Sequence, residues 1–119
     1  MTQEDKELLL KDLCARLPYG VIIQIKDWAV LDAELKIGHI NRLQINDVEL
    51  KPYLFPLSSM TDEQKVIYGD LCYSVIQSLA NNMQSELNEL INWLNANHFD
   101  YRGLIEKGLA IDATNLNIY

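Results

Sequence analysis

The stretch Glu86–Leu109, ELNELINWLNANHFDYRGLIEKGL, carries the clearest helical pattern of the chain, and we expect the fold to be organised around it. Its leucines and isoleucine recur at the spacing of one helix face, while glutamates and asparagines occupy the other face. We expect Ser85 to cap this helix and Asn97 to end it, because asparagine tolerates the left-handed backbone conformation. Asp100 then caps a second, short helix that ends at Gly108.

The corner between these two helices, NHFDYR, carries His98, Asp100, Tyr101 and Arg102 within five residues. One interpretation is a binding or catalytic corner, because histidine and aspartate are common acid–base groups. The other is structural, because helix caps and turns select the same residue types and the aromatic side chains can pack inward. We favour the structural interpretation for the corner itself.

The composition indicates one folded domain that spans residues 1–119. Hydrophobic residues make up 49% of the chain, which is enough for a core. No apolar run has membrane-spanning length, and the N-terminal sequence MTQEDKE does not look like a signal peptide. We therefore expect a cytoplasmic protein without membrane contact.

The net charge of −7 is unevenly distributed along the chain. Residues 1–60 hold seven Lys or Arg against nine Asp or Glu, whereas residues 61–119 hold three against eight. Binding to a phosphate backbone needs clustered basic residues, so we expect no direct nucleic-acid binding. An acidic C-terminal half can meet a basic partner, although such acidity more often serves solubility.

The sequence lacks the phosphate-binding motifs GxxxxGK[ST] and GxGxxG and the metal-binding motif HExxH. It also lacks GxSxG, the motif that carries a nucleophilic serine. Cys14 and Cys72 lie outside any CxxC pattern, and we interpret both as small core residues. His39 and His98 are too far apart in sequence to indicate a shared metal site. We expect no metal and no other cofactor, and the residues favour a protein that is not an enzyme.

The N-terminal half predicts a helix followed by a small sheet. Thr2 caps a helix over about residues 3–16, which Pro18 and Gly20 end. Residues 38–41, GHIN, are expected to form a turn. β-Branched and alternating runs predict short antiparallel strands at residues 21–28, 30–37, 42–45 and 48–50.

The segment Lys51–Ser59, KPYLFPLSS, is predicted to be a linker, because Pro52 and Pro56 force extended geometry. Tyr53 and Phe55 make it apolar, so we expect it to pack across the sheet. The alternative is a strip on which a partner docks.

The C-terminal half predicts helices. Thr61 and Gln64 form a capping box that opens a helix to about residue 80. Asn81–Asn82 is the expected break before the next helix, and one long helix to Asn97 is the alternative. The expected fold is α+β, with an N-terminal helix, a three- or four-stranded antiparallel meander, and two or three C-terminal helices packed on one face. The buried stripe of the first C-terminal helix is expected to consist of Ile67, Leu71, Val75, Ile76 and Leu79.

Three blocks of sequence occur in a recognisable order: LKDLCARLPYGV at 10–21, KPYLFPLSSMT at 51–61 and WLNANHFDYRGLIEKGLAID at 93–112. Together they resemble a widespread group of small uncharacterised proteins of gut anaerobic bacteria, their phages and mobile elements. The resemblance implies a cytoplasmic accessory protein of the kind that phages carry. It implies no particular activity and no catalytic residue.

We expect a non-enzymatic protein that acts by contact with another protein, in the manner of an accessory or inhibitor protein. Aromatic residues and arginine are the usual anchors of interfaces. The candidate binding residues are therefore Trp93, His98, Asp100, Tyr101, Arg102, Tyr53 and Phe55. Two alternatives stay open: a small enzyme that uses His98 and Asp100 as acid–base groups, and a self-assembling module that forms a homodimer.

Overall fold

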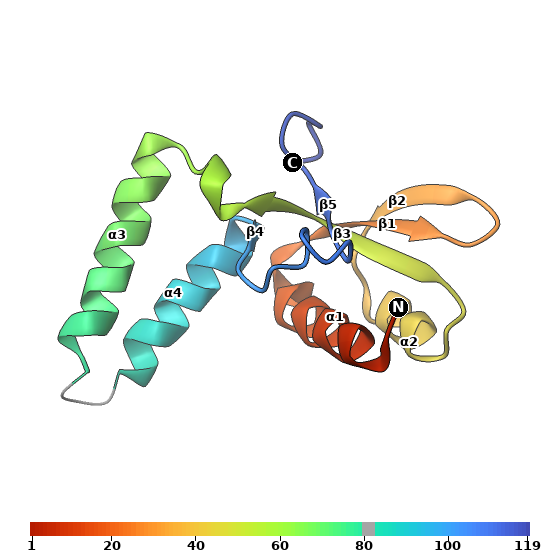
Figure 1. Ribbon diagram of the computed structural model, residues 1–119, viewed down its shortest axis with the longest axis horizontal. Coiled ribbons are helices and arrows are strands. Elements are labelled where there is room, and N and C mark those ends of the chain that lie inside the picture. The colour runs from red at the N-terminus through yellow and green to blue at the C-terminus, as the bar shows by residue number, and fades with distance from the viewer. Residues whose placement is uncertain (80–82) are drawn as a thin grey trace.

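Residues 1–79 and 83–119 are the part of the chain that the computed structural model describes, and they form an α+β fold (Figure 1). In chain order the elements are α1 (Gln3–Arg16), β1 (Ile22–Lys26), β2 (Val30–Glu34), α2 (Ile37–Gln44), β3 (Glu49–Pro56), α3 (Asp62–Gln77), α4 (Gln84–Ala96), β4 (Phe99–Asp100) and β5 (Ile111–Asp112). Short 3₁₀ turns follow α1 at Leu17–Tyr19 and β3 at Leu57–Ser59. The predicted class and the N-terminal position of the first helix are confirmed.

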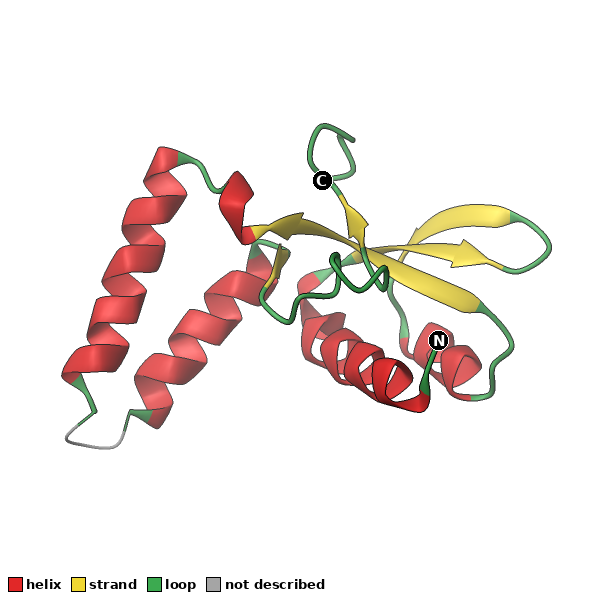
Figure 2. Cartoon of the chain, viewed as in Figure 1, coloured by secondary structure: helices red, strands yellow, loops and turns green. Residues whose placement is uncertain are grey.

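Strand β3 is the centre of the sheet (Figure 2). Its first half pairs antiparallel with β1, which in turn pairs antiparallel with β2. Its second half pairs parallel with β5 and with β4, two short strands from the C-terminal segment. The strands of the described chain therefore form one mixed sheet, and the prediction of a purely antiparallel meander is wrong.

The predicted linker over residues 51–59 is also wrong, because most of it lies in β3. The extended backbone that proline imposes is equally compatible with a strand. This segment forms a strand because distant segments of the chain supply hydrogen-bond partners for its backbone. The N–H of Phe55 donates to the carbonyl of His98 at 2.8 Å, and the N–H of Ala113 donates to the carbonyl of Leu54 at 2.8 Å. These partners lie more than forty residues away in sequence.

Helix α2 replaces the predicted turn at 38–41 and the predicted strand at 42–45. Ile40 and Leu43 are both buried, and their spacing of three residues is that of one helix face. The N–H of Lys36 donates to Nδ1 of His39 at 2.9 Å, which satisfies a backbone donor at the start of the helix. A helix with so few residues is stable here because α1 and the sheet cover its apolar face.

The main hydrophobic core lies between the sheet and the helices α1 and α2, which sit on the same side of it (Figure 1). Helix α1 confirms the prediction over residues 3–16, and Oγ1 of Thr2 accepts the N–H of Asp5 at 3.0 Å as its cap. The interpretation of the cysteines as core residues is wrong for Cys14, which is exposed, whereas Cys72 is half-buried. The buried residues of this core include Leu9, Leu13, Val21, Ile23, Leu35, Ile40, Leu43, Leu50, Leu54 and Leu104.

Helices α3 and α4 form a hairpin that extends away from the sheet instead of packing on one of its faces (Figure 1). The capping box of α3 is confirmed, because the N–H of Gln64 donates to Oγ1 of Thr61 at 3.1 Å and the N–H of Thr61 donates to Oε1 of Gln64 at 2.9 Å. The described residues contain two C-terminal helices, whereas the predicted break at 81–82 lies outside them.

The ends of α4 differ from the prediction. Met83 occupies the capping position in place of Ser85, which lies within the helix. Asn97 ends the helix with φ −98°, and the left-handed residue is the next one, His98, with φ +61°. The chain therefore reverses direction one residue later than expected. Phe99, the next residue, is buried and begins β4.

Candidate functional site

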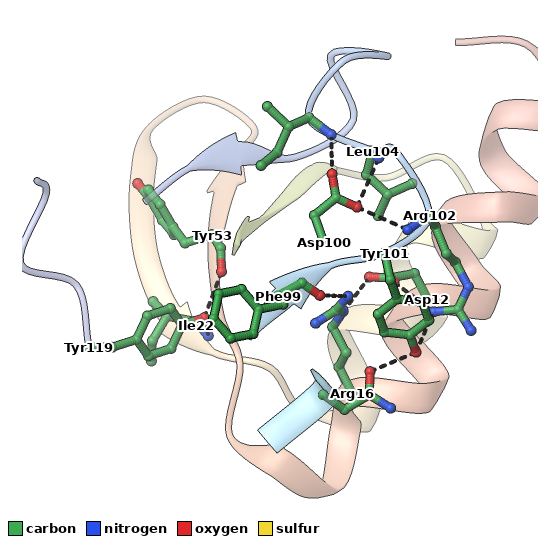
Figure 3. A network of polar contacts seen from close by, with 12 residues as sticks. Asp12, Arg16, Ile22, Tyr53, Phe99, Asp100, Tyr101, Arg102, Leu104 and Tyr119 are labelled. Carbon is green, nitrogen blue, oxygen red and sulfur yellow. Dashed lines mark hydrogen bonds and ion pairs between the residues drawn. The ribbon is translucent and has the colours of Figure 1, made fainter. Parts of the chain in front are cut away.

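A buried ion pair on α1 holds the C-terminal corner in place. Asp12 and Arg16 lie one helical turn apart, both fully buried, and Nε of Arg16 is 2.8 Å from Oδ2 of Asp12. Nη2 of Arg16 donates to the carbonyl of Phe99 at 2.7 Å, and Nη1 of Arg102 donates to Oδ1 of Asp12 at 2.8 Å (Figure 3). The carboxylate of Asp12 thus bridges two guanidinium groups.

The ring of Tyr101 contacts the same two cations. The guanidinium carbon of Arg16 lies 5.2 Å from the ring centroid, and that of Arg102 lies 4.7 Å from it, within the range of cation–π attraction. The hydroxyl of Tyr101 donates to Oδ1 of the buried Asn95 at 2.8 Å and accepts from Arg102 at 3.0 Å. Tyr101 and Arg102 are therefore part of a closed polar network (Figure 3).

Asp100 has the predicted capping role. Its Oδ1 accepts the N–H groups of Arg102 at 3.2 Å and Leu104 at 3.0 Å, and its Oδ2 accepts the N–H of Ile105 at 2.9 Å. Both carboxylate oxygens of this buried side chain thus hold backbone donors, as Figure 3 shows. The geometry favours a structural role for Asp100 and lends no support to acid–base chemistry there.

The predicted short helix from Tyr101 to Gly108 is wrong, because this segment forms consecutive turns. The N–H of Leu109 donates to the carbonyl of Leu104 at 2.9 Å, and the N–H of Gly108 donates to that of Ile105 at 3.1 Å. Together with φ +73° at Gly108, this is the hydrogen-bond pattern that closes a helix. The cap at Asp100 and this stop lie so close together that only about one turn fits between them.

His98 forms a stack with the C-terminal aromatic residue. Its ring centroid lies 3.8 Å from that of Tyr119, with 10° between the planes. Burial, together with the positive charge of Arg16, lowers the pKa of His98 to about 4, so its ring is neutral at pH 7. Its Nδ1 is buried and lacks a hydrogen-bond partner among the described residues.

The hydroxyl of Tyr119 bridges two strands. It accepts the N–H of Ile22 at 2.9 Å and donates to the carbonyl of Tyr53 at 2.8 Å. Burial raises the pKa of Tyr119 to about 12. Tyr53 itself is buried, and its own hydroxyl donates to Oδ1 of Asp32 at 2.7 Å.

Aromatic rings connect the helical hairpin to the sheet. The ring of Trp93 stacks on Phe99 with 5.7 Å between centroids and on Tyr68 with 6.4 Å. Phe55 packs edge-on against Phe99 at 6.3 Å and lies 5.8 Å from Tyr119. Trp93 and Phe55 are thus half-buried members of a second, smaller core.

The structure brings the candidate residues together around the corner but uses most of their polar atoms within the chain. Two open hollows flank the corner: one of about 360 Å³ beside His98 and Tyr119, and one of about 380 Å³ beside Asp100 and Tyr101. Their role in binding stays a prediction. The burial of Asp12 and Arg16 could not be predicted from the sequence, because the residues that complete their contacts, Phe99 and Arg102, are distant in the chain.

Exposed apolar side chains lie elsewhere, at sites that the sequence interpretation missed. Trp28, in the turn between β1 and β2, is almost completely exposed. Ile67 and Ile76 of α3, and Leu79 just after the helix, are exposed as well, although all three were expected to be buried. The spacing of Val66, Tyr73 and Ile76 is itself a helical signal that could have identified a second apolar face.

Comparison with known proteins adds no relative: no protein-family model, no curated protein and no solved structure matches the chain. Within the described residues, no group of three or more His, Cys, Asp or Glu side chains is arranged to hold a metal ion. None of the helices that the structure describes has the length and apolarity needed to cross a lipid bilayer.

Proposed function

We propose that this chain is a non-enzymatic, cytoplasmic accessory protein that binds another protein through the outer face of helix α3. The observation that carries the proposal is the exposure of α3. No side chain of this 16-residue helix, which lies wholly in the described part of the chain, is buried. A helix of this length normally owes its stability to burial of one face.

The outer face of α3 carries an apolar stripe, defined here as Val66, Gly69, Tyr73 and Ile76. These residues follow the spacing i, i+3, i+7 and i+10, which places them on one side of the helix. Val66 is 64% exposed, Tyr73 61% and Ile76 59%. The opposite side faces α4, where Tyr68 stacks on Trp93. Since α3 is apolar on both sides, the free side fits a partner with an apolar groove.

The charges of the hairpin indicate the kind of partner. Its helices carry five carboxylates, Asp62, Glu63, Asp70, Glu86 and Glu89, against one lysine, Lys65. A protein surface with a basic rim around an apolar groove would complement this hairpin. Such contact fits an accessory or inhibitor-like protein that covers a basic site of its partner.

The corner is a weaker candidate for this contact. Asp100 already accepts backbone amides, and Arg102 already donates to the buried carboxylate of Asp12. The ring of Tyr101 contacts two guanidinium groups. A partner that recruited these groups would first have to break contacts that support the fold. The exposed stripe requires no such rearrangement.

The test is affinity capture with the 119-residue chain and two matched double variants. In Tyr73→Ser/Ile76→Ser the stripe becomes polar, whereas Asn88→Ala/Asn92→Ala changes exposed residues of α4 and serves as the control. We expect a stoichiometric partner that the control retains and the stripe variant binds at least about tenfold more weakly. Circular dichroism and thermal melts establish that both variants are folded.

Two further measurements separate the alternatives. Neutralisation of Asp62 and Asp70 to Asn should weaken the contact and reduce its dependence on salt, if the partner is basic. A mass measurement in solution detects a homodimer that the stripe variant converts to monomer, which would support self-assembly instead. Retention of the partner by the stripe variant contradicts the proposal, and its loss in a folded His98→Ala variant would locate the contact at the corner.

A further inference from the structure

The hydroxyl of Tyr119 bridges strands β1 and β3 at the position where their backbone pairing ends. The pairing of β1 with β3 ends at Ile23 opposite Pro52, so the next pair in this register is Ile22 with Tyr53. At that point the Tyr119 hydroxyl accepts the N–H of Ile22 at 2.9 Å and donates to the carbonyl of Tyr53 at 2.8 Å (Figure 3). A phenol therefore satisfies one donor and one acceptor of the backbone at once.

The ring of Tyr119, a residue that stays 45% exposed, lies in an open slot with aromatic walls. The neutral His98 ring stacks on it at 3.8 Å, and Phe55 lies 5.8 Å away at an angle of 50°. His98 itself has a left-handed backbone, with φ +61°. The hollow of about 360 Å³ that adjoins these residues is open to solvent and leads to them.

The slot discriminates by chemistry. A phenylalanine ring can stack on His98 equally well, but it would leave the N–H of Ile22 and the carbonyl of Tyr53 without this bridge. A serine or threonine hydroxyl would supply the bridge without the stacked ring. The combination of a flat aromatic wall and a donor–acceptor pair at its end selects a phenol.

The segment that connects β5 to Tyr119 is held mostly at its two ends. Ala113 donates its N–H to Leu54, whereas residues 114–117 are exposed and turn through left-handed Asn115 and Asn117. The hydrogen bonds described for this turn are local, such as those of Thr114 to Asp112. The ring can therefore leave the slot by rotation of this turn while β5 stays paired with β3.

We propose that the slot formed by Ile22, Tyr53 and His98 is a binding site for a tyrosine side chain of another polypeptide, and that Tyr119 fills it in this structure as a ligand from the same chain. The partner tyrosine displaces Tyr119, stacks on His98 and restores the two backbone hydrogen bonds. This site is separate from the α3 stripe and does not rest on the function proposed for it.

The test uses the Tyr119→Ala variant of the whole 119-residue chain, which removes the side chain that fills the slot. The probes are N-acetyl-tyrosinamide and N-acetyl-phenylalaninamide, and the readout is the ¹H–¹⁵N resonance of the Ile22 amide. We expect the tyrosine probe to shift this resonance saturably at about millimolar concentration, and the phenylalanine probe to bind about tenfold more weakly. In the wild-type chain Tyr119 competes from within, so the tyrosine probe should bind at least about tenfold more weakly there.

The control is Tyr119→Ala/His98→Asn, which removes the stacking wall while asparagine tolerates the left-handed backbone. It should lose the response to the tyrosine probe by about tenfold. Equal binding of the two probes, equal binding by wild type and Tyr119→Ala, or an unmoved Ile22 resonance would overturn the proposal. Tighter binding of free L-tyrosine than of N-acetyl-tyrosinamide would overturn the assignment to a polypeptide.

A second variant covers the case in which Tyr119→Ala does not fold. Tyr119→Phe keeps the ring and removes only the hydroxyl. We expect the Ile22 amide of this variant to exchange with solvent about tenfold faster or more, with the amides of α1 unchanged. An unchanged exchange rate at Ile22 would show that the hydroxyl does not serve as the bridge, and the proposal would fail.

Discussion

The carboxylate of Asp12 and the guanidinium group of Arg16 are buried charges whose only compensation comes from named partners within the described chain. Removal of one member leaves the other buried and unpaired, which typically costs about 3–5 kcal/mol. We therefore expect Asp12→Ala to lower the free energy of unfolding by about 3 kcal/mol or more, because it frees both Arg16 and Arg102. Urea denaturation followed by circular dichroism measures this loss.

The matched control is Lys36→Gln, which removes an ion pair with Glu34 in which both side chains are exposed. Water already solvates these charges, so we expect no measurable change in the denaturation midpoint. If Asp12→Ala were as stable as Lys36→Gln, the buried pair would not support the fold as its geometry indicates.

His98 makes the stability depend on pH in a defined direction. Its pKa in the folded protein is about 4, below the ordinary value of 6.5, so the unfolded chain takes up the proton first as the pH falls. The contribution of the neutral His98 ring to stability should therefore be fully present above about pH 7 and decrease as the pH falls toward 4. The decrease should be about 1–2 kcal/mol, less than the full shift implies because His98 is partly exposed.

The measurement is the free energy of unfolding at several pH values for wild type and for His98→Asn. Asparagine keeps the left-handed conformation accessible but does not titrate in this range. The difference between the two profiles isolates His98 from the carboxylates and from His39. A difference that stayed constant between pH 4 and 7 would contradict the assignment.

At the scale of elements, two glycines allow a test of backbone conformation without a packing effect. A Cβ atom added at Gly69 or at Gly108 would meet no atom within 4 Å among the described residues. Gly69 lies inside helix α3, whereas Gly108 has φ +73°. We expect Gly69→Ala to stabilise the protein by about 0.5–1 kcal/mol and Gly108→Ala to destabilise it by about 1 kcal/mol.

Chemical denaturation of the two variants in parallel measures both changes in the free energy of unfolding, the increase expected at position 69 and the decrease expected at position 108. Alanine at position 69 restricts the unfolded chain and suits the helix, whereas alanine at position 108 must adopt a left-handed conformation. Destabilisation by Gly69→Ala would mean that α3 is distorted at this position. An unaffected Gly108→Ala variant would mean that the turn before β5 does not need its left-handed residue.

Elements whose signals are local agree with the sequence. The caps at Thr2, Thr61 and Asp100 act on backbone groups two to five residues away, so a short window of sequence contains the whole interaction. Helix α2 shows the opposite case. Ile40 and Leu43 carry too short a pattern to separate a helix from a strand, and the burial of both residues decides the question.

At the scale of the whole molecule, the helical hairpin makes the protein elongated. Its dimensions are 50 × 30 × 23 Å and its radius of gyration is 15.4 Å, compared with roughly 13.5 Å expected for a compact domain of this length. The contact between hairpin and body runs through α4, β4 and the aromatic cluster of Trp93 and Phe99. Helix α3, in which no side chain is buried, therefore has little support from the main core.

We expect the amide hydrogens of α3 to exchange faster than those of α1 and β3, whose side chains enter the main core. Native-state hydrogen exchange at neutral pH measures the protection of each helix and strand. Equal protection of α3 and α1 would show that the hairpin opens only with the whole fold. Added protection of α3 in the presence of a partner would agree with the proposed contact.

The structure of the corner could be predicted in part from the sequence. The concentration of His98, Asp100, Tyr101 and Arg102 marks a corner, and the structural interpretation of Asp100 follows from capping rules. The partners of this corner were not recognisable, because Arg16 reaches Phe99 across 83 positions and Ile22 reaches Tyr119 across 97. No local pattern encodes such pairs.

The sequence by itself determined the α+β class, the first helix, the capping box of α3 and the polar corner, because each depends on hydrogen bonds or periodicity within a few residues. Only the tertiary structure decided that residues 49–56 form the central strand and that Asp12 and Arg16 are buried. It also decided which face of α3 stays free and where Tyr119 lies. These features depend on which distant segments meet, and burial and strand pairing are properties of that meeting rather than of any single stretch of chain.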